Sequence, residues 1–323
     1  MKFETNDTNS DVTARVPADR QITTLEVHLG PSRRQFGGLV VFAAILLLIY
    51  SSPLLKLILF VLHTDLYSHI LLIPFVSGYL IWVGRGKLRV ESRPSPGMAA
   101  LSAAAGGLVL GGYRLAAWYG WSLAMPDYLA AMVLSFLLFV FAGGLIFLGA
   151  RYLQNVALPV AFLFFCIPFP VVLRRAIESF FQHGSADTAY VMFKLSGMPV
   201  LREGTFFQLP GCPLDVAPEC SGIHSSLVLV ITSLVAAHLF LRKTWHRWVL
   251  VSAVILLGLL RNGFRIFVIG QLCVRCGPQM IDSPIHRRGG PIFFLLALIP
   301  LFLLLRYLNM RELREIQRGK LSA

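Results

Sequence analysis

Three side chains that together could break and remake a peptide bond lie near the ends of apolar segments. Cys220 follows a polar, turn-forming run and directly precedes the apolar segment Ile223–Leu241. A cysteine in the first turn of a helix meets unpaired N–H groups and the positive end of the helix dipole, and both favour its nucleophilic thiolate form. The neighbouring Glu219 opposes the thiolate, so we expect a cationic partner. The sequence offers two candidates, Arg265 and His286.

Two arginines, Arg261 and Arg265, lie inside a long apolar segment, with Asn262 between them. Charged groups within a membrane helix are costly, so both guanidinium groups are expected to face a polar interior and to have partners. The spacing of four residues puts the two arginines on one face of the helix. The alternatives are a structural ion pair that fixes helix packing, or a pair of residues that lines a transport path in a non-enzymatic transporter or scaffold.

His286 lies in a polar loop shortly before the last apolar segment. Taken alone, a loop histidine is more commonly a solvated residue than a catalytic one. Here, however, a thiol, an intramembrane guanidinium and an imidazole come to the same-side ends of three successive apolar segments. Such a set supplies a nucleophile, a cation for a developing oxyanion and a proton shuttle. These are the groups that acyl transfer through a thioester requires.

The composition is that of an integral membrane protein. Of the 323 residues, 56% are hydrophobic and only 14% are charged, whereas a soluble globular chain has about 25% charged residues. In a membrane protein, a formal net charge of +13 indicates basic cytoplasmic loops beside anionic lipid rather than nucleic-acid binding. We therefore predict an all-α polytopic bundle in the lipid bilayer, with no separate soluble domain, no nucleic-acid partner and no metal or other cofactor.

Eight apolar stretches are predicted to cross the bilayer. The first is interrupted at Ser51–Pro53, where we expect a kink or an early end. Residues 174–196 are amphipathic and too polar to span, which predicts a helix at the membrane surface. Residues 197–218 have the composition of strands and turns, which predicts a short β-like insertion. The predicted spans are residues 36–62, 70–83, 97–118, 128–148, 156–173, 220–241, 248–272 and 291–307.

The distribution of basic residues orients these spans. Eight spans put both termini on the same side of the membrane. The loops and tails on that side hold more Lys and Arg than the loops on the other, so we predict that both termini are cytoplasmic. Cys220, the segment 174–218 and the loop 273–290 then lie outside the cytoplasm.

The chain is expected to consist of one transmembrane domain with two tails. Residues 1–35 are polar and lack the apolar core of a signal peptide, so they are predicted to be a disordered cytoplasmic tail. The transmembrane domain is predicted over residues 36–308. Residues 309–323 are predicted to be a basic cytoplasmic tail.

The five cysteines raise a second possibility. Cys273 and Cys276 form a CxxC pattern outside the membrane, which could serve a membrane thiol–disulfide oxidoreductase. An inert structural disulfide or a chance spacing is the simpler interpretation, and a zinc site lacks a second pair of ligands nearby. A disulfide between Cys212 and Cys220 would disable the nucleophile, so we predict that Cys220 is free. Cys166 is expected to pack in the core.

Several motifs follow one another as they do in a known family. The run Cys220–Ile223, which reads CSGI, the pattern Asn262-x-x-Arg265-Ile266 and the downstream His286 resemble the exosortase and archaeosortase family. The similarity covers most of the chain, from about Asp65 to Phe294, and CSGI is nearer the bacterial form. Further matches to the pattern are Tyr67-Ser68-His69, Ile167-Pro168-Phe169-Pro170, Gly197–Val200, Gly204, Leu209-Pro210 and Val216-Ala217.

The resemblance implies a multi-spanning cysteine transpeptidase of the bacterial inner membrane, with its active site on the outer side. Such enzymes cut secreted proteins whose C-terminal sorting signal has a PEP-like motif (PEP-CTERM), a membrane helix and a basic tail. In bacteria the family is linked to exopolysaccharide producers. Carried onto this sequence, the nucleophile is Cys220, the oxyanion-stabilising arginine is Arg265, and the general acid and base is His286. The acceptor of the acyl group would be water or an amine, which could be lipid-linked.

Two features depart from the family pattern. Pro218 and Glu219 precede the cysteine, and His224 follows CSGI, at positions where small, apolar or other polar residues are common. His224 lies about one turn from the cysteine and competes with His286 as the base, although His286 is the preferred candidate. His69 is a further candidate for a supporting or substrate-contacting role, and a capping or interfacial role is the alternative.

Overall fold

The computed structural model describes residues 32–84, 93–121, 123–217, 221–277, 279–280 and 290–321. This part of the chain is mainly helical and contains one antiparallel sheet of three strands, in the order β1-β2-β3. The predicted all-α membrane fold with a short β-like insertion is therefore confirmed.

The elements before the sheet are α1 (Arg33–Ile49), α2 (Ser51–Leu62), the 3-10 helix η1 (Asp65–Leu71), α3 (Ile73–Gly84), α4 (Pro96–Trp118), α5 (Met125–Phe147), α6 (Ala150–Asn155), α7 (Ala157–Phe162), the 3-10 helix η3 (Leu163–Cys166) and α8 (Val171–Leu195). The remaining elements are β1 (Leu201–Glu203), β2 (Phe206–Leu209), β3 (Cys212–Asp215), α9 (Ile223–Phe240), α10 (Thr244–Cys276) and α12 (Gly290–Leu321).

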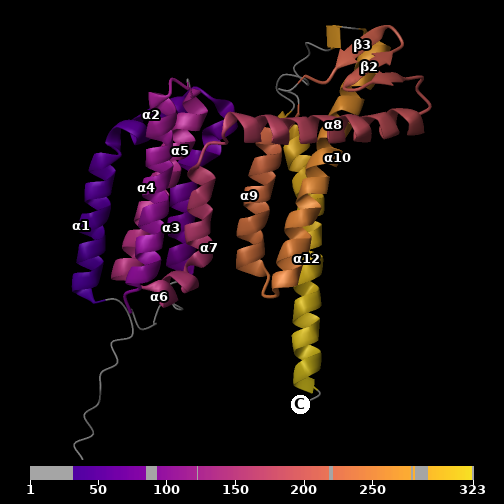
Figure 1. Ribbon diagram of the computed structural model, residues 1–323. Coiled ribbons are helices and arrows are strands. Elements are labelled where there is room, and N and C mark those ends of the chain that lie inside the picture. The colour runs from indigo at the N-terminus through magenta and orange to yellow at the C-terminus, as the bar shows by residue number, and fades with distance from the viewer. Residues whose placement is uncertain are drawn as a thin grey trace, which may run out of the picture.

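The upright helices form two groups (Figure 1). The first group runs from α1 to α7, and the second consists of α9, α10 and α12, which contact one another. Helix α8 starts beside the first group and runs across one end of the second, and the sheet lies beyond α8 at that same end (Figure 1). One apolar core packs the first group against α9, and a second core lies among α9, α10 and α12. The described chain thus consists of two helix groups that are joined by α8 and that also pack against each other along α9.

The helices match the predicted membrane spans in number and position. Six described helices are long and apolar enough to cross a membrane, and two bent helix pairs bring the number of spans up to eight. The six are Leu66–Gly84, Pro96–Trp118, Met125–Phe147, Ile223–Phe240, Thr244–Cys276 and Gly290–Arg318. The two bent pairs are Arg33–Ile49 with Ser51–Leu62, and Ala157–Cys166 with Val171–Leu195.

The expected kink in the first span lies at Tyr50. Helices α1 and α2 meet there at an angle of 70°. Pro53 lies in the first turn of α2, where a missing N–H removes no hydrogen bond of the helix. The Tyr50 hydroxyl makes a buried hydrogen bond of 2.7 Å to the hydroxyl of Ser135, which in turn donates to the carbonyl of Gly106. This chain of bonds fixes the bend against α5 and α4.

The fifth predicted span is shorter than expected. Its helical part ends at Cys166 rather than near residue 173, and α8 leaves it at an angle of 96°. Pro168 and Pro170 cause the break, because proline cannot donate a helix hydrogen bond and disfavours helical geometry in the residue before it. Helix α8 then covers the segment predicted to lie at the membrane surface and runs across the upright helices (Figure 1).

Helix α8 packs closely on α10 through glycines. A Cβ atom at Gly263 of α10 would lie 2.5 Å from the Cβ of Thr188, and one at Gly270 would lie 2.5 Å from the ring of Phe193. Both approaches are far shorter than a normal carbon–carbon contact, so only glycine allows the two helices to cross at this distance. This crossing sets the height of α10 relative to the surface helix.

The sheet covers the junction of α8 and α10. Alternate residues of its strands, Phe207, Leu209 and Leu214, are buried against apolar side chains of both helices. An ion pair of 2.7 Å between Arg202 and Asp187 joins β1 to α8. The Gln182 side chain of α8 donates to the carbonyl of the residue that follows β3. The segment that leads towards residue 220 is therefore held on two helices, α8 and α10.

The opposite end of α10 is closed by a carboxylate. Glu312 of α12 is 2% exposed. It accepts hydrogen bonds from the backbone N–H groups of Arg242 and Lys243, at 2.8 and 2.9 Å, and is 2.8 Å from Nδ1 of His246. Helix α12 continues to Leu321, so the segment after residue 308 extends the helix by several turns.

Candidate functional site

The predicted nucleophile and general acid lie outside the described residues. Cys220, its neighbour Glu219 and His286 all belong to the part of the chain on which the structure gives no information. The residues on either side of that part, and the predicted partners on α10, are described. The site is therefore built here from Ser221 and Gly222 on one side and from α10 on the other.

Two side chains of α10 hold the backbone that follows Cys220. The Nδ2 of Asn262 donates to the carbonyl of Ser221 at 3.0 Å, and Nη2 of Arg261 donates to the carbonyl of Gly222 at 3.3 Å. Asn262 and Ser221 are almost completely buried, at 1% and 0% exposure. Ser221 is the residue bonded to Cys220 in the chain, so α10 fixes the backbone immediately after the predicted nucleophile.

Gly222 is required by this arrangement. It has φ +75° and ψ 14°, in the left-handed region, and it caps the start of α9. A Cβ atom here would lie 2.8 Å from Nη2 of Arg261 and 2.8 Å from Oδ1 of Asn262. Both the backbone conformation and the space therefore exclude a side chain. This explains the glycine of the CSGI run in physical terms.

Helix α9 starts later than predicted. Its first helical residue is Ile223. The span was predicted to begin at residue 220, with Cys220 in its first helical turn. The reason is Gly222, because its left-handed conformation does not fit a right-handed helix and the helix begins only after it. The argument that Cys220 lies within the first turn of α9 was therefore wrong, although the cysteine does precede the positive end of that helix.

Arg265 lines a pocket and Arg261 does not. The pocket is small, with a cavity volume of about 20 Å³, and lies between α10 and the chain of β3. Arg265 is half-buried in its wall, one helical turn after Arg261, whose side chain instead reaches the carbonyl of Gly222. The residues that line the pocket are Leu214, Asp215, Val216, Asn262, Arg265, Ile266 and Ile269. The two arginines, which the sequence could not separate, thus have different surroundings.

The pocket also contains a carboxylate that the sequence analysis missed. Asp215, the exposed last residue of β3, lines the same pocket as Arg265 from the opposite side and accepts a hydrogen bond of 3.4 Å from the Thr205 hydroxyl. A signal was present, because an acidic residue alternates with the apolar Leu214 and Val216 just before the cysteine. Its significance depends on the strand packing against α10, which the sequence does not show.

The Tyr67-Ser68-His69 run brings the first helix group to the start of α9. The Ser68 hydroxyl is 3.3 Å from Nε2 of His224, the second residue of α9. The Tyr67 hydroxyl donates to the carbonyl of Phe169 at 3.4 Å, in the bend before α8. His69 is 9% exposed, and its Nδ1 has no hydrogen-bond partner in the described part of the chain. His69 and His224 therefore lie in one region of the bundle, next to the CSGI run.

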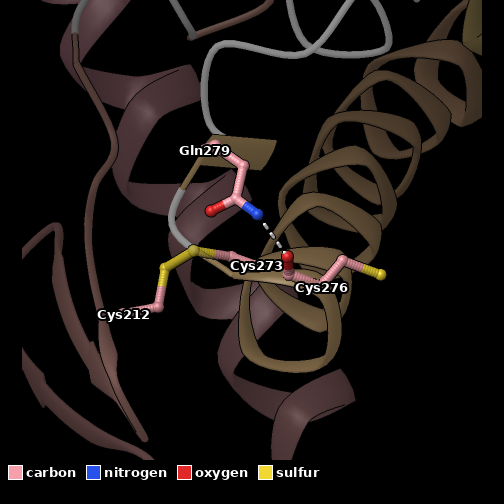
Figure 2. The surroundings of a disulfide bond; sticks show 4 residues. All are labelled: Cys212, Cys273, Cys276 and Gln279. Carbon is pink, nitrogen blue, oxygen red and sulfur yellow. Dashed lines mark hydrogen bonds between the residues drawn. A yellow bond between two sulfur atoms is a disulfide. The ribbon is translucent and has the colours of Figure 1, made fainter.

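The cysteines pair in a way that the sequence did not indicate. Cys212 of β3 forms a disulfide with Cys273 of α10 (Figure 2). Cys276 is an exposed free thiol, and Cys166 is a buried free thiol in the apolar core, where it was expected. The two cysteines of the CxxC pattern are therefore not bonded to each other, and Cys212 is not bonded to Cys220. The disulfide pins β3, one wall of the pocket, to the last turn of α10.

The chemistry available at this site follows from these contacts. A guanidinium group and an amide lie in a pocket bounded by a strand and a membrane helix, and the same amide fixes the residue bonded to Cys220. Cationic and N–H donors fixed in position are what a developing oxyanion needs. Within the described residues, no group of three or more His, Cys, Asp or Glu side chains is arranged to hold a metal ion.

Comparison with known proteins gives a single match. No curated protein and no solved structure matches the chain significantly. The model of the transmembrane exosortase family, however, matches residues 60–303, which include the helices from α3 to α10, the sheet and the CSGI run. That range begins in α2 and ends in α12, so it covers every element that forms the site. This chain belongs to the transmembrane exosortase family.

Proposed function

We propose that this protein is a membrane-embedded cysteine transpeptidase that cleaves the C-terminal sorting signals of secreted proteins. The observation that carries the proposal is the attachment of the CSGI backbone to α10. Asn262 bonds to the residue after Cys220 and also lines the pocket of Arg265. Two motifs that are about 40 residues apart in the sequence therefore meet at one place, as a shared active site requires.

The proposed reaction proceeds through an acyl-enzyme. The Cys220 thiolate attacks the scissile carbonyl carbon, and the guanidinium of Arg265 stabilises the oxyanion that forms. His286 protonates the leaving amine and the peptide bond breaks, leaving a thioester. His286 then takes a proton from the acceptor, an amine or water, as the acceptor attacks the thioester and releases Cys220.

The disulfide supports an extracytoplasmic site. Disulfides persist in oxidising compartments and are rare in the cytosol, and the Cys212–Cys273 bond lies at the same end of the bundle as the pocket. The basic residues concentrated in the opposite loops and tails agree with this orientation. In the proposed arrangement, the protein spans the bacterial inner membrane, both termini are cytoplasmic, and the substrate is cut after export.

An apolar groove supports a substrate with a membrane helix. It has a volume of about 380 Å³ and runs below α8 along α9, starting at the residue that follows Gly222. Its lining is almost entirely apolar and includes Phe180 of α8, Leu227 and Val230 of α9, and Ile255 of α10. The proposed sorting signal combines a short motif with an apolar helix, so that helix could occupy the groove while the motif enters the pocket.

The experiment that tests this function measures the intact mass of a secreted candidate substrate. The substrate, carrying a C-terminal motif, an apolar helix and a basic tail, is co-expressed with the wild-type protein or with Cys220→Ala. We expect cleavage in the wild type and none in Cys220→Ala. The mass of the product identifies the cut site and shows whether water or an amine took the acyl group.

Cys276→Ser is the matched control, because Cys276 is an exposed free thiol that is not among the residues that line the pocket. It should cleave like the wild type. If Cys276→Ser loses the activity and Cys220→Ala keeps it, the protein is a thiol–disulfide oxidoreductase of the CxxC type. If neither substitution changes the activity, the result favours a transporter or scaffold.

A further inference from the structure

Three cysteines, Cys212, Cys273 and Cys276, lie near the pocket. Cys212 and Cys273 are 0% and 1% exposed, so reagents from solvent do not reach their disulfide. Cys276 lies three residues after Cys273, on the last turn of α10, and is exposed. The structure therefore places one reactive free thiol next to one protected disulfide.

The spacing allows Cys276 to approach the disulfide. Residues three apart on a helix have Cβ atoms about 5–6 Å apart, and a disulfide requires about 3.5–4.5 Å. A shift of about 1–2 Å is therefore needed, and it falls at a helix end, where the backbone frays most readily. Gly277, with φ +99°, ends α10 directly after Cys276.

Two described hydrogen bonds hold the turn around Cys276. The N–H of Gly277 donates to the carbonyl of Cys273 at 2.9 Å, and Nε2 of Gln279 donates to the carbonyl of Cys276 at 2.7 Å. Figure 2 shows the Cys276 sulfur pointing away from the disulfide. A rotation about its Cα–Cβ bond, together with the opening of these two bonds, brings it towards Cys273.

We propose that Cys276 is the resolving thiol of an internal disulfide exchange that controls the pocket. The Cys276 thiol loses its proton to water, and the thiolate attacks the Cys273 sulfur. The Cys273–Cys276 bond forms, the Cys212–Cys273 bond breaks, and Cys212 leaves as a thiolate that takes up a proton. One disulfide and one thiol are present before and after the step, so no oxidant or reductant is required.

The exchange affects the site because Cys212 begins β3. Two residues later the same strand supplies Leu214 and Asp215 to the pocket of Arg265. With the disulfide in place, this wall is covalently fixed to α10. After exchange, β3 loses its covalent link to α10 and keeps its pairing with β2 and its apolar packing. In the Cys212–Cys273 form, β3 is therefore fixed against α10 and the pocket keeps its shape. In the Cys273–Cys276 form, β3 can move relative to α10.

The chemical step is tested in the full-length Cys220→Ala protein in membranes, so that it does not depend on Cys220. Samples are held at about pH 7 or about pH 8.5, quenched with acid, denatured and alkylated, and the cysteine peptides are mapped by mass spectrometry. We expect free Cys212 and a Cys273–Cys276 peptide to accumulate together, about tenfold faster at the higher pH because the thiolate fraction of a cysteine rises over that range.

The control carries Cys276→Ser in addition and should keep the Cys212–Cys273 bond throughout. The proposal is overturned if the mapped disulfide never changes, or if Cys212 becomes free at the same rate without Cys276. The regulatory part rests on the proposed function and is measured by substrate cleavage in proteins that retain Cys220. After incubation at about pH 8.5, the wild type should lose activity and Cys276→Ser should not. Exchange without any difference in cleavage overturns control of the pocket, whereas an absence of cleavage in both proteins before incubation contradicts the proposed function alone.

Discussion

The two ends of α10 are fixed by different kinds of contact. At the end near Thr244, the buried carboxylate of Glu312 from α12 accepts hydrogen bonds from two backbone N–H groups and pairs with His246. These contacts hold the turn before α10. At the other end, Arg261 and Asn262 donate to the backbone of Ser221 and Gly222, and Arg265 lines a pocket. The difference separates a structural end from an end that is equipped to bind.

Substitutions at the two ends of α10 should therefore have different effects. Changes at the Glu312 end should lower stability and leave the turnover of the folded protein unchanged. Changes at the pocket end should lower turnover at nearly constant stability. The following substitutions test the comparison, beginning with the largest expected effect.

Arg265→Lys should reduce substrate cleavage by about 10²–10³-fold, as expected when an oxyanion donor is lost. Lysine keeps the positive charge but lacks the planar fork of N–H donors. The measurement is the rate of product formation at equal amounts of membrane-inserted protein. Cleavage near the wild-type rate would make Arg265 a packing residue and would remove the main difference between the two ends.

Gly222→Ala should reduce cleavage by about tenfold to a hundredfold. The left-handed conformation costs an alanine about 1–2 kcal/mol, and its Cβ would meet Arg261 and Asn262 at 2.8 Å. The segment that follows Cys220 must therefore shift. Rates are compared with those of Gly107→Ala in α4, where a Cβ meets no atom within 4 Å. Equal rates in the two variants would show that the position of this backbone does not matter.

Glu312→Gln should lower the free energy of unfolding by about 2 kcal/mol, because an amide places its N–H₂ group against donors that need an acceptor. The thermal unfolding midpoint is measured in membranes or detergent, and turnover is measured per folded molecule. Glu315→Gln is the control, since Glu315 is exposed and pairs only with the Lys243 side chain in the described part. A normal midpoint but impaired turnover would contradict the assignment of this end as structural.

Ser68→Ala should have the smallest effect, about threefold or less in cleavage rate, because it removes one hydrogen bond of 3.3 Å at an exposed serine that is worth about 0.5–1 kcal/mol. The same rate assay is used, with Ser102→Ala as a control in the first helix group. A loss greater than about tenfold would extend the site into that group and would make the comparison one of three regions rather than two.

The sequence predicts the membrane architecture well, because it depends on the length and polarity of segments. The spans, the surface helix and the β-like insertion follow from these properties, and the break after Cys166 follows from two prolines. Boundaries that depend on tertiary contacts were less accurate. The start of α9 was placed too early because the left-handed Gly222 is set by side chains of α10.

The candidate site was predicted only in part, for a related reason. The pairing of Cys212 with Cys273, 61 residues apart, cannot be deduced from cysteine spacing. The place of Asp215 in the pocket depends on which face of β3 meets α10. The roles of Cys220 and His286 stay predictions, since both residues lie outside the described part of the chain.

The length of α12 has a consequence for depth in the bilayer. Its 32 residues rise about 48 Å at 1.5 Å per residue, whereas the hydrocarbon layer is about 30 Å thick. The last turns, which carry the exposed Arg311 and Arg314, must therefore project into the headgroup region or beyond it. The apolar half of α12 lies in the hydrocarbon layer, and its arginines stay at the level of the headgroups. Helix α12 would therefore set the depth of the whole protein in the bilayer, even where the shorter helices could fit at another depth.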